Sequence, residues 1–188
     1  MSMTLANPSI AILVANGFDE NHMTAVQRAM TQESKPYKII APEQGLVNGW
    51  QDNAWGHYFT VDDSISTAMG SDHDMLILIG GERGVAKLKD NLHTRRIVNH
   101  FLEAKKPIAA IGSGVGLLAL SPKSAGLSVA ASDDVHAELK DGNIEVVSEN
   151  LAVDGVILTA DGGDVEAWIE GVTNLAGNCL QDSEAQAA

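Results

Sequence analysis

The chain has 188 residues, 45% of them hydrophobic, which is enough to bury the core of one domain. Twelve Lys and Arg against 25 Asp and Glu give a formal net charge of −13, which disfavours binding to nucleic acid and to anionic membranes. The apolar runs fall short of the roughly 20 residues that cross a bilayer and the N-terminus does not resemble a secretion signal, so we expect a cytoplasmic protein.

In the first half of the chain, short apolar runs alternate with amphipathic segments, which is typical of βαβ units around a parallel sheet. Strands are expected at 9–15, 37–41 and 75–79, with a weaker edge strand at 57–61. Helices are expected over about 20–31 and 93–104, and a short helix capped by Ser64 up to Met69. A turn-rich link is expected at 45–49 and a polar loop after Gly81.

The second half of the chain continues the pattern. Strands are expected at 108–111, 144–147 and 156–159, a short apolar helix at 115–120, and a closing helix at 165–176. About 1–8 and 181–188 are expected to be flexible tails. No repeat or low-complexity linker divides the sequence, so we predict one α/β domain over residues 1–188, with a mostly parallel sheet.

Three loops follow strands of this predicted sheet and are the places where a ligand is expected, because ligands of parallel sheets gather at the carboxyl ends of the strands. They are 16–22, 80–84 and 112–116. The third loop passes from strand to helix through Gly112-Ser113-Gly114, a sharp corner similar to a nucleophile elbow.

The segment Lys-Pro-Ile-Ala-Ala-Ile-Gly-Ser-Gly-Val at 106–115 resembles the Lys-Pro-Ile-Ala-Ala-Ile-Cys-His-Gly-Pro segment of the ThiJ/PfpI family. Further similar segments occur in family order at 12–20, 41–45, 72–81 and 153–160. The resemblance implies the class I glutamine amidotransferase-like fold: a flavodoxin-like three-layer sandwich with helices on both faces of the sheet. It also implies a homodimer or larger homo-oligomer. The elbow is similar, too, to that of the noncatalytic C-terminal domains of large-subunit catalases.

The chain departs from the family pattern at the residues that carry the family's chemistry. Gly112 stands where the family has its nucleophilic cysteine, and Ser113 where many members have a histidine. His22 stands where the family has its active-site glutamate, while Asp19 and Glu20 match the acids that precede it. The resemblance therefore does not imply peptidase, amidase or glyoxalase activity for this chain.

Two functions follow from these departures. The first is a noncatalytic binding, oligomerisation or stress-related accessory protein. The second is a hydrolase or amidase acting on a small acyl or carbonyl substrate, with Ser113 as nucleophile and His22 as its base. The structural alternative is that Ser113 caps the following helix and His22 only lies on the face of the first helix.

A ligand could also bind at the corner without covalent chemistry. The backbone amides of Gly80, Gly81, Gly112, Ser113 and Gly114 could present donors to a small anionic or carbonyl ligand, or the glycines could serve only to turn the backbone.

We expect no cofactor and no metal, because the six histidines lack metal-site spacing and the acids of 161–166 fit a turn and a helix start. Cys179 is interpreted as a packing residue. Trp50 and Trp55 lie either in a subunit contact or in the core.

Overall fold

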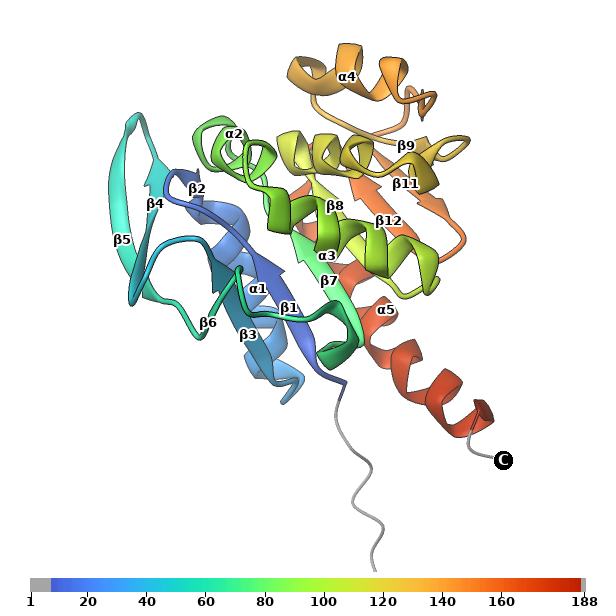
Figure 1. Cartoon of the computed structure of the whole chain (residues 1–188), viewed down its shortest axis with the longest axis horizontal. Coiled ribbons are helices and arrows are strands. Elements are labelled where there is room, and N and C mark those ends of the chain that lie inside the picture. The colour runs from blue at the N-terminus through green and yellow to red at the C-terminus, as the bar shows by residue number, and fades with distance from the viewer. Residues whose placement is uncertain (1–7, 187–188) are drawn as a thin grey trace, which may run out of the picture.

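A seven-stranded sheet forms the centre of the computed structural model, which describes residues 8–186 (Figure 1). Its strands in spatial order are β11 (Leu151–Asp154), β12 (Ile157–Ala160), β8 (Ile108–Ile111), β7 (Met75–Leu78), β1 (Ile10–Leu13), β3 (Tyr37–Ala41) and β6 (Asp63–Ser64). All neighbours pair in parallel except β11 and β12. The three central strands and β12 are buried throughout, which explains their unbroken apolar sequences.

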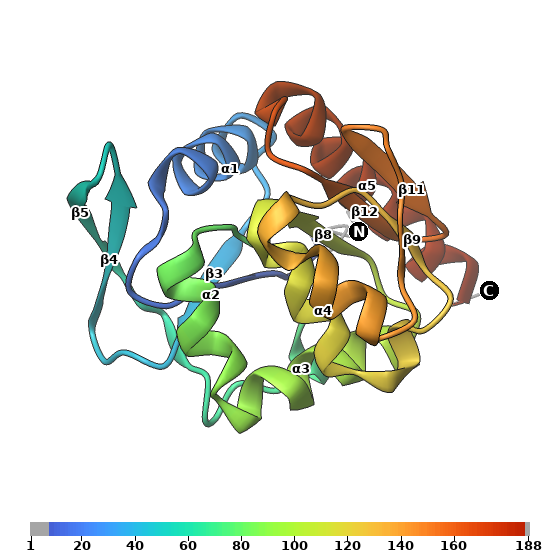
Figure 2. The ribbon, with the colours of Figure 1, turned by 90° about the horizontal axis from the view of Figure 1, so that it is seen from above.

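Helices cover both faces of the sheet (Figure 2). On one face lie α1 (Glu20–Gln32) and α5 (Val165–Gln186), and on the other lie α2 (Glu82–Lys89), α3 (Leu92–Glu103), α4 (His136–Asp141) and a 3-10 helix, Gly112–Leu120. Each face has its own core because successive strand side chains point to opposite sides. Ile12 packs with the α1 and α5 core, whereas its neighbour Leu13 packs with the α2 and α3 core. This confirms the predicted flavodoxin-like α/β class.

Two small sheets complete the fold. The first joins β2 (Phe18–Asp19), β4 (Leu46–Gln51) and β5 (Ala54–Thr60), and its β4–β5 hairpin stands away from the central sheet in both ribbon views (Figures 1 and 2). The second pairs β9 (Ser128–Val129) with β10 (Glu145–Val146). Further 3-10 turns are Gly70–Asp72, Pro122–Ser124 and Asp133–Val135.

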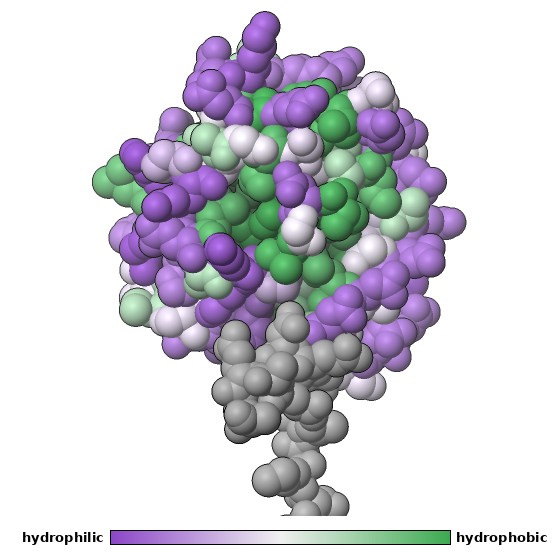
Figure 3. All heavy atoms as spheres, turned by 90° about the vertical axis from the view of Figure 1, so that its right-hand side faces the viewer, coloured by the Kyte–Doolittle hydropathy of each residue, from purple (hydrophilic) through white to green (hydrophobic). Residues whose placement is uncertain are grey.

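The edge strand β11 closes the central sheet on the side where α5 ends. Seen from that side, Figure 3 shows an apolar area framed by hydrophilic side chains. Val153 of β11 is 67% exposed. In the part of the chain that the structure describes, no helix has both the length and the apolar character needed to cross a membrane.

Several predicted elements were wrong. Residues 46–49 of the expected link belong to strand β4, which pairing with both β2 and β5 stabilises. The expected helix from Ser64 to Met69 does not form, since Ser64 ends the short strand β6. The expected polar loop after Gly81 is helix α2, whose eight residues give too short an apolar pattern to be recognised. The closing helix extends past Ala176 to Gln186.

The remaining differences concern the ends of the chain and one region near the C-terminus. Residues 1–7 and 187–188 of the expected tails lie outside the described residues. Between the 3-10 helix Gly112–Leu120 and β12, the structure adds β9, α4 and β11, which have no expected counterparts. All three are six residues or shorter, a length at which periodicity carries little information.

Candidate functional site

The three expected loops converge at one pocket beyond the carboxyl ends of β1, β7 and β8. This carboxyl-edge pocket has a volume of about 340 Å³. Its lining residues are Asp19, His22, Gly81, Glu82, Gly112, Ser113, Ser132, Asp134, Asp161 and Gly162. Of the predicted site residues, His22, Gly81, Gly112 and Ser113 therefore meet, and two later loops that the sequence did not indicate join them.

The other two predicted glycines lie behind the pocket wall. A Cβ atom on Gly114 would approach the carbonyl oxygens of Leu78 and Ile79 to 2.8 Å, so this glycine allows the corner to pack against β7. A Cβ atom on Gly80 would lie 2.9 Å from the carbonyl oxygen of Ile111 and 3.1 Å from the His22 ring. Both glycines serve close packing.

Gly112 sits at the corner with a left-handed backbone, at a φ angle of +59°. A Cβ atom placed there would make ordinary van der Waals contacts, with Cε1 of His22 at 3.6 Å and the carbonyl oxygen of Asp161 at 3.9 Å, and would clash with nothing. The position therefore has room for a side chain, and its backbone conformation rather than crowding favours glycine.

Ser113 is 6% exposed, and its hydroxyl oxygen accepts a hydrogen bond from the backbone N–H of Gly81 at 2.9 Å. Among residues 8–186, Gly81 is the hydrogen-bond partner of the Ser113 side chain. The hydroxyl neither pairs with His22 nor caps the following 3-10 helix, which has no side-chain cap. The predicted capping role was wrong, because the corner turns the hydroxyl toward the neighbouring loop.

His22 lies in the first turn of α1, which Asp19 caps by accepting the backbone N–H groups of Asn21 and His22. The side chain is 9% exposed, and its Nε2 atom is 3.7 Å from Oδ2 of Asp19. Its Nδ1 atom is buried and has no hydrogen-bond partner in the described part of the chain. Burial lowers the pKa of His22, against an opposing effect of Asp19, so the ring is neutral near pH 7.

Acidic side chains dominate the pocket's charge. Asp19, Glu82, Asp134 and Asp161 line it, and no Lys or Arg of residues 8–186 does. Asp19 caps α1 and Glu82 lies in the first turn of α2, so carboxylates already stand at the helix N-termini that could attract an anion. The Gly81 N–H group, expected to bind an anion, donates to Ser113 instead. The lining therefore favours binding of a hydrogen-bond donor or a cation over binding of an anion.

Glu20 points away from this pocket, toward the β4–β5 hairpin. Its side chain is 5% exposed and accepts the backbone N–H of His57 at 2.8 Å, while its other oxygen pairs with the His57 ring. The carboxyl group fits against Gly49 and Gly56, where any Cβ atom would clash with it. The first turn of α1 thus joins the pocket to the hairpin.

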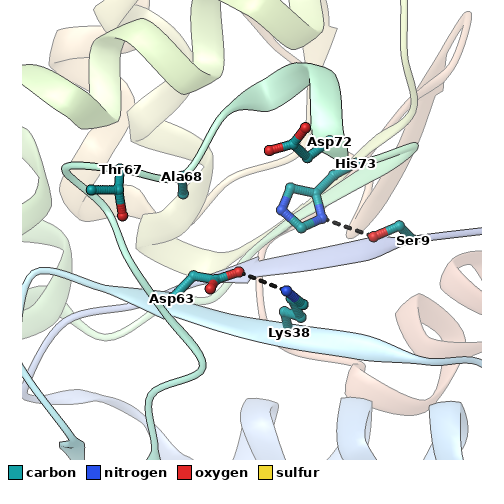
Figure 4. Close-up of a pocket in the computed structure, with 7 residues that line it drawn as sticks. All are labelled: Ser9, Lys38, Asp63, Thr67, Ala68, Asp72 and His73. Atoms are coloured by element: carbon teal, nitrogen blue, oxygen red, sulfur yellow. Dashed lines mark hydrogen bonds and ion pairs between the residues drawn. The ribbon is translucent and has the colours of Figure 1, made fainter.

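A second cavity, of about 290 Å³, lies among the loops that precede β1 and β7 (Figure 4). Ser9 and His73 meet there through a 2.9 Å hydrogen bond from or to Nδ1 of the ring, and Lys38 donates to Asp63 at 3.0 Å. The backbone N–H of Ser9 also donates to Asp74. These contacts tie the loop before β7 to the start of β1, which is a structural role.

The other features considered in the sequence are a metal site, Cys179 and the two tryptophans, and neither Cys179 nor the tryptophans line the carboxyl-edge pocket. In the described part of the chain, no group of three or more His, Cys, Asp or Glu residues is placed to hold a metal ion. Cys179 is half-buried on α5 and its thiol donates to the carbonyl of Leu175. Trp55 is 54% exposed, so a core role for it was wrong. Its ring packs edge-on against Trp50, over which Arg83 stacks at 4.1 Å.

Comparison with curated proteins gives relatives of two kinds. General stress protein 18 of Bacillus subtilis (strain 168) is 25% identical over 162 residues, which are 85% of this chain and 92% of that protein. Catalase HPII of Mycobacterium avium is 30% identical over 115 residues, which are 61% of this chain and 16% of that catalase. Catalase-2 of Bacillus subtilis (strain 168) is matched over 18% of its length, so the chain spans less than a fifth of either catalase.

Solved structures share the fold at low sequence identity. A ThiJ/PfpI domain protein from Brachyspira murdochii superposes with a TM-score of 0.82 at 22% identity, covering 92% of this chain and 98% of that one. Schizosaccharomyces pombe DJ-1 gives a TM-score of 0.77 at 16% identity, covering 93% and 97% of the two chains. The model of the DJ-1/PfpI family matches residues 8–174. With its fold, its corner and this match over most of its length, the chain belongs to the DJ-1/PfpI family.

Proposed function

We propose that this protein is a noncatalytic, cytoplasmic member of the DJ-1/PfpI family that binds a small molecule in the carboxyl-edge pocket. The observation that carries the proposal is the corner itself. Gly112, at the position where the sequence resemblance places the cysteine, offers no side chain to a substrate, yet it lines a pocket of about 340 Å³. The pocket is retained while the nucleophile is not.

The alternative, a hydrolase that uses Ser113 and His22, has less support from the geometry. A serine nucleophile needs a base within hydrogen-bond reach of its hydroxyl. The Ser113 hydroxyl is bonded to Gly81, and the nearest atom of the His22 ring to the corner at Gly112 is the carbon Cε1. The hydroxyl thus helps to hold two loops together, a role that a noncatalytic protein would keep.

A stress-related role is the second part of the proposal. It is supported by the similarity to general stress protein 18, which extends over 85% of this chain. The catalase matches support no more than a shared domain, because they cover less than a fifth of each catalase.

Self-association is the third part of the proposal. Leu46, Trp55 and Tyr58 of the β4–β5 hairpin are 53%, 54% and 70% exposed, and exposed apolar and aromatic side chains are typical of subunit contacts. Sedimentation equilibrium of the wild type and of Tyr58→Glu tests this point. We expect a dimer or larger assembly that the substitution weakens, and a monomeric wild type would contradict it.

Activity assays test the noncatalytic character. Wild type, Ser113→Ala and the control Ser66→Ala, a change at an exposed serine outside the pocket, are compared for p-nitrophenyl ester hydrolysis, amide hydrolysis and glyoxal consumption. We expect all three proteins to match the buffer rate. A wild-type rate above buffer that Ser113→Ala abolishes establishes the hydrolase instead, and a rate that survives both changes also refutes the noncatalytic proposal.

A further inference from the structure

We infer that a cavity at the amino end of β12 binds a small amphipathic anion, a molecule with an apolar body and one carboxylate head group. This amino-edge cavity has a volume of about 320 Å³ and lies between the end of α3 and the start of β12. Ile157, the first residue of β12, lines it, whereas Asp161, which follows the last residue of that strand, lines the carboxyl-edge pocket. The two sites are therefore separate, and the inference goes beyond the proposed function.

Apolar side chains form most of the wall of the amino-edge cavity. Five of its nine lining residues are hydrophobic, namely Phe101, Leu102, Leu127, Val156 and Ile157. Phe101 and Ile157 are buried, whereas the other three are partly exposed where they pack against the core. The end of α3 and the β11–β12 turn lie on the right-hand side of Figure 1, the side that Figure 3 faces and on which an apolar area is visible. Burial of this surface by an apolar ligand would favour binding.

Two lysines place positive charge at the mouth of the cavity. Lys105, just after α3, and Lys123, in the 3-10 turn Pro122–Ser124, both line the cavity and are exposed. In the described part of the chain, neither ammonium group forms an ion pair or a side-chain hydrogen bond, unlike Lys89, which pairs with Glu138. Both cations are thus available to an anionic head group.

The acid in the wall does not neutralise these lysines. Asp154 accepts the backbone N–H of Ser128 at 2.9 Å, and it lies beyond ion-pair distance of both ammonium groups. The cavity therefore has a surplus of positive charge in a chain whose net charge is −13. An anion is the ligand that complements this local charge.

The backbone at Lys105 is an independent observation. Its φ angle is +54°, in the left-handed region, directly after Ala104 ends α3. The N–H groups of Lys105 and Lys106 donate to the carbonyls of Leu102 and Phe101, a helix ending at which glycine is usual because a side chain is unfavourable there. An unfavourable conformation that is kept points to a function of the side chain. Here the side chain supplies one of the two cations of the mouth.

The lining discriminates against other ligand classes. A sugar or another molecule that is polar throughout would place its hydroxyl groups against apolar side chains, which is costly without hydrogen-bond partners. An organic cation would be repelled by the two lysines. The described residues provide no group that could hold a metal ion. The volume of about 320 Å³ suits a small molecule.

Calorimetric titration of the full chain tests the inference with octanoate as the probe. Butyrate, which has the same head group and a shorter body, and octyltrimethylammonium, which has a similar body and the opposite charge, are compared at matched ionic strength. We expect octanoate to bind with a Kd at least tenfold below that of butyrate, because it buries more methylene groups. Octyltrimethylammonium should bind more weakly than octanoate, although the net charge of the chain attracts it.

Three lysine variants locate the site. Lys105→Gln and Lys123→Gln should each raise the Kd of octanoate about threefold or more, since each removes one cation from the mouth. The matched control is Lys140→Gln, which removes the same charge at an exposed position of α4 outside the cavity. It should leave the Kd within about twofold, because salt screens distant charges.

Lys105→Gly separates binding from folding. It removes the cation and the unfavourable backbone conformation together, so it should raise the Kd of octanoate while the urea midpoint also rises. No heat with octanoate, equal binding of octyltrimethylammonium, equal effects of Lys123→Gln and Lys140→Gln, or an unchanged Kd for Lys105→Gly would each overturn the inference. These outcomes leave the noncatalytic proposal untouched, because it concerns residues at the opposite ends of the strands.

Discussion

The backbone N–H of Gly81 donates a 2.9 Å hydrogen bond to the hydroxyl oxygen of Ser113, two residues that are 32 positions apart in the sequence. This bond joins the loop after β7 to the loop after β8 and fixes one wall of the pocket. It also occupies the one hydroxyl that could have replaced the family's nucleophile at the corner.

Substitution of Ser113 by alanine should therefore lower stability. The half-buried Gly81 N–H group would lose its acceptor, and since a fully buried donor left unsatisfied costs about 1–3 kcal/mol, we expect the free energy of unfolding to fall by about 1 kcal/mol. Urea denaturation measures the loss. The control is Ser66→Ala, since Ser66 is exposed and should change stability by less than about 0.5 kcal/mol. An unchanged urea midpoint for Ser113→Ala would show that water or the chain replaces the bond.

Alanine at two glycines of the same corner should have unequal effects. Gly112→Ala has room for its methyl group but keeps a φ angle of +59°, which costs about 1–2 kcal/mol. Gly114→Ala has an ordinary φ angle, yet its methyl group would press at 2.8 Å on the carbonyl oxygens of Leu78, the last residue of β7, and of the following Ile79. Because that backbone is fixed within the sheet, Gly114→Ala should be the more destabilising change in urea denaturation. The opposite order would contradict the geometry of the corner.

Glu20 should be the main anchor of the β4–β5 hairpin. Glu20→Ala removes the acceptor for the His57 backbone N–H and leaves the space between Gly49 and Gly56 unfilled. We expect a loss of about 2–3 kcal/mol in urea denaturation, because a buried network is broken. His57→Ala is the matched control: it keeps the backbone bond and removes a ring that is 80% exposed, so its effect should be smaller. Equal losses in the two variants would assign the anchoring to the His57 ring instead.

The free energy of unfolding should fall as the pH drops below about 6.5, because two histidines, His22 and His73, are buried in the folded chain. Burial lowers the pKa of His22 and, against the effect of Asp72, that of His73 below the ordinary value of 6.5. Below pH 6.5 the unfolded chain binds protons that the folded chain does not, so the free energy of unfolding decreases toward lower pH. Each histidine contributes at most about 1.4 kcal/mol per pH unit.

Urea denaturation between pH 7.5 and 5 measures this dependence. We expect His73→Gln to reduce the slope of the free energy of unfolding against pH by up to the equivalent of one proton. A wild-type slope that His73→Gln does not alter would assign the acid sensitivity to other groups.

Much of the fold could be predicted because it depends on local signals. The strands that carry the site are fully buried, so their sequences are continuous apolar runs, each followed within four residues by a glycine. The resemblance placed His22 against the corner at Gly112, and the structure brings these residues together. Strand β4 and helix α2 were missed because a two-sided strand pairing and a short helix leave weak patterns in the sequence.

The sequence by itself determined the family, the sheet and the glycine at the corner, because backbone turns and buried strands restrict which residues can occupy them. Only the tertiary structure decided what the corner does. In the folded chain the Ser113 hydroxyl accepts a hydrogen bond from the Gly81 N–H. Asp134 and Asp161 line the same pocket as Asp19, which lies more than a hundred residues earlier in the chain. Hydrogen bonds and charges between such distant residues depend on how the loops cross in space, and no spacing within the sequence specifies that crossing.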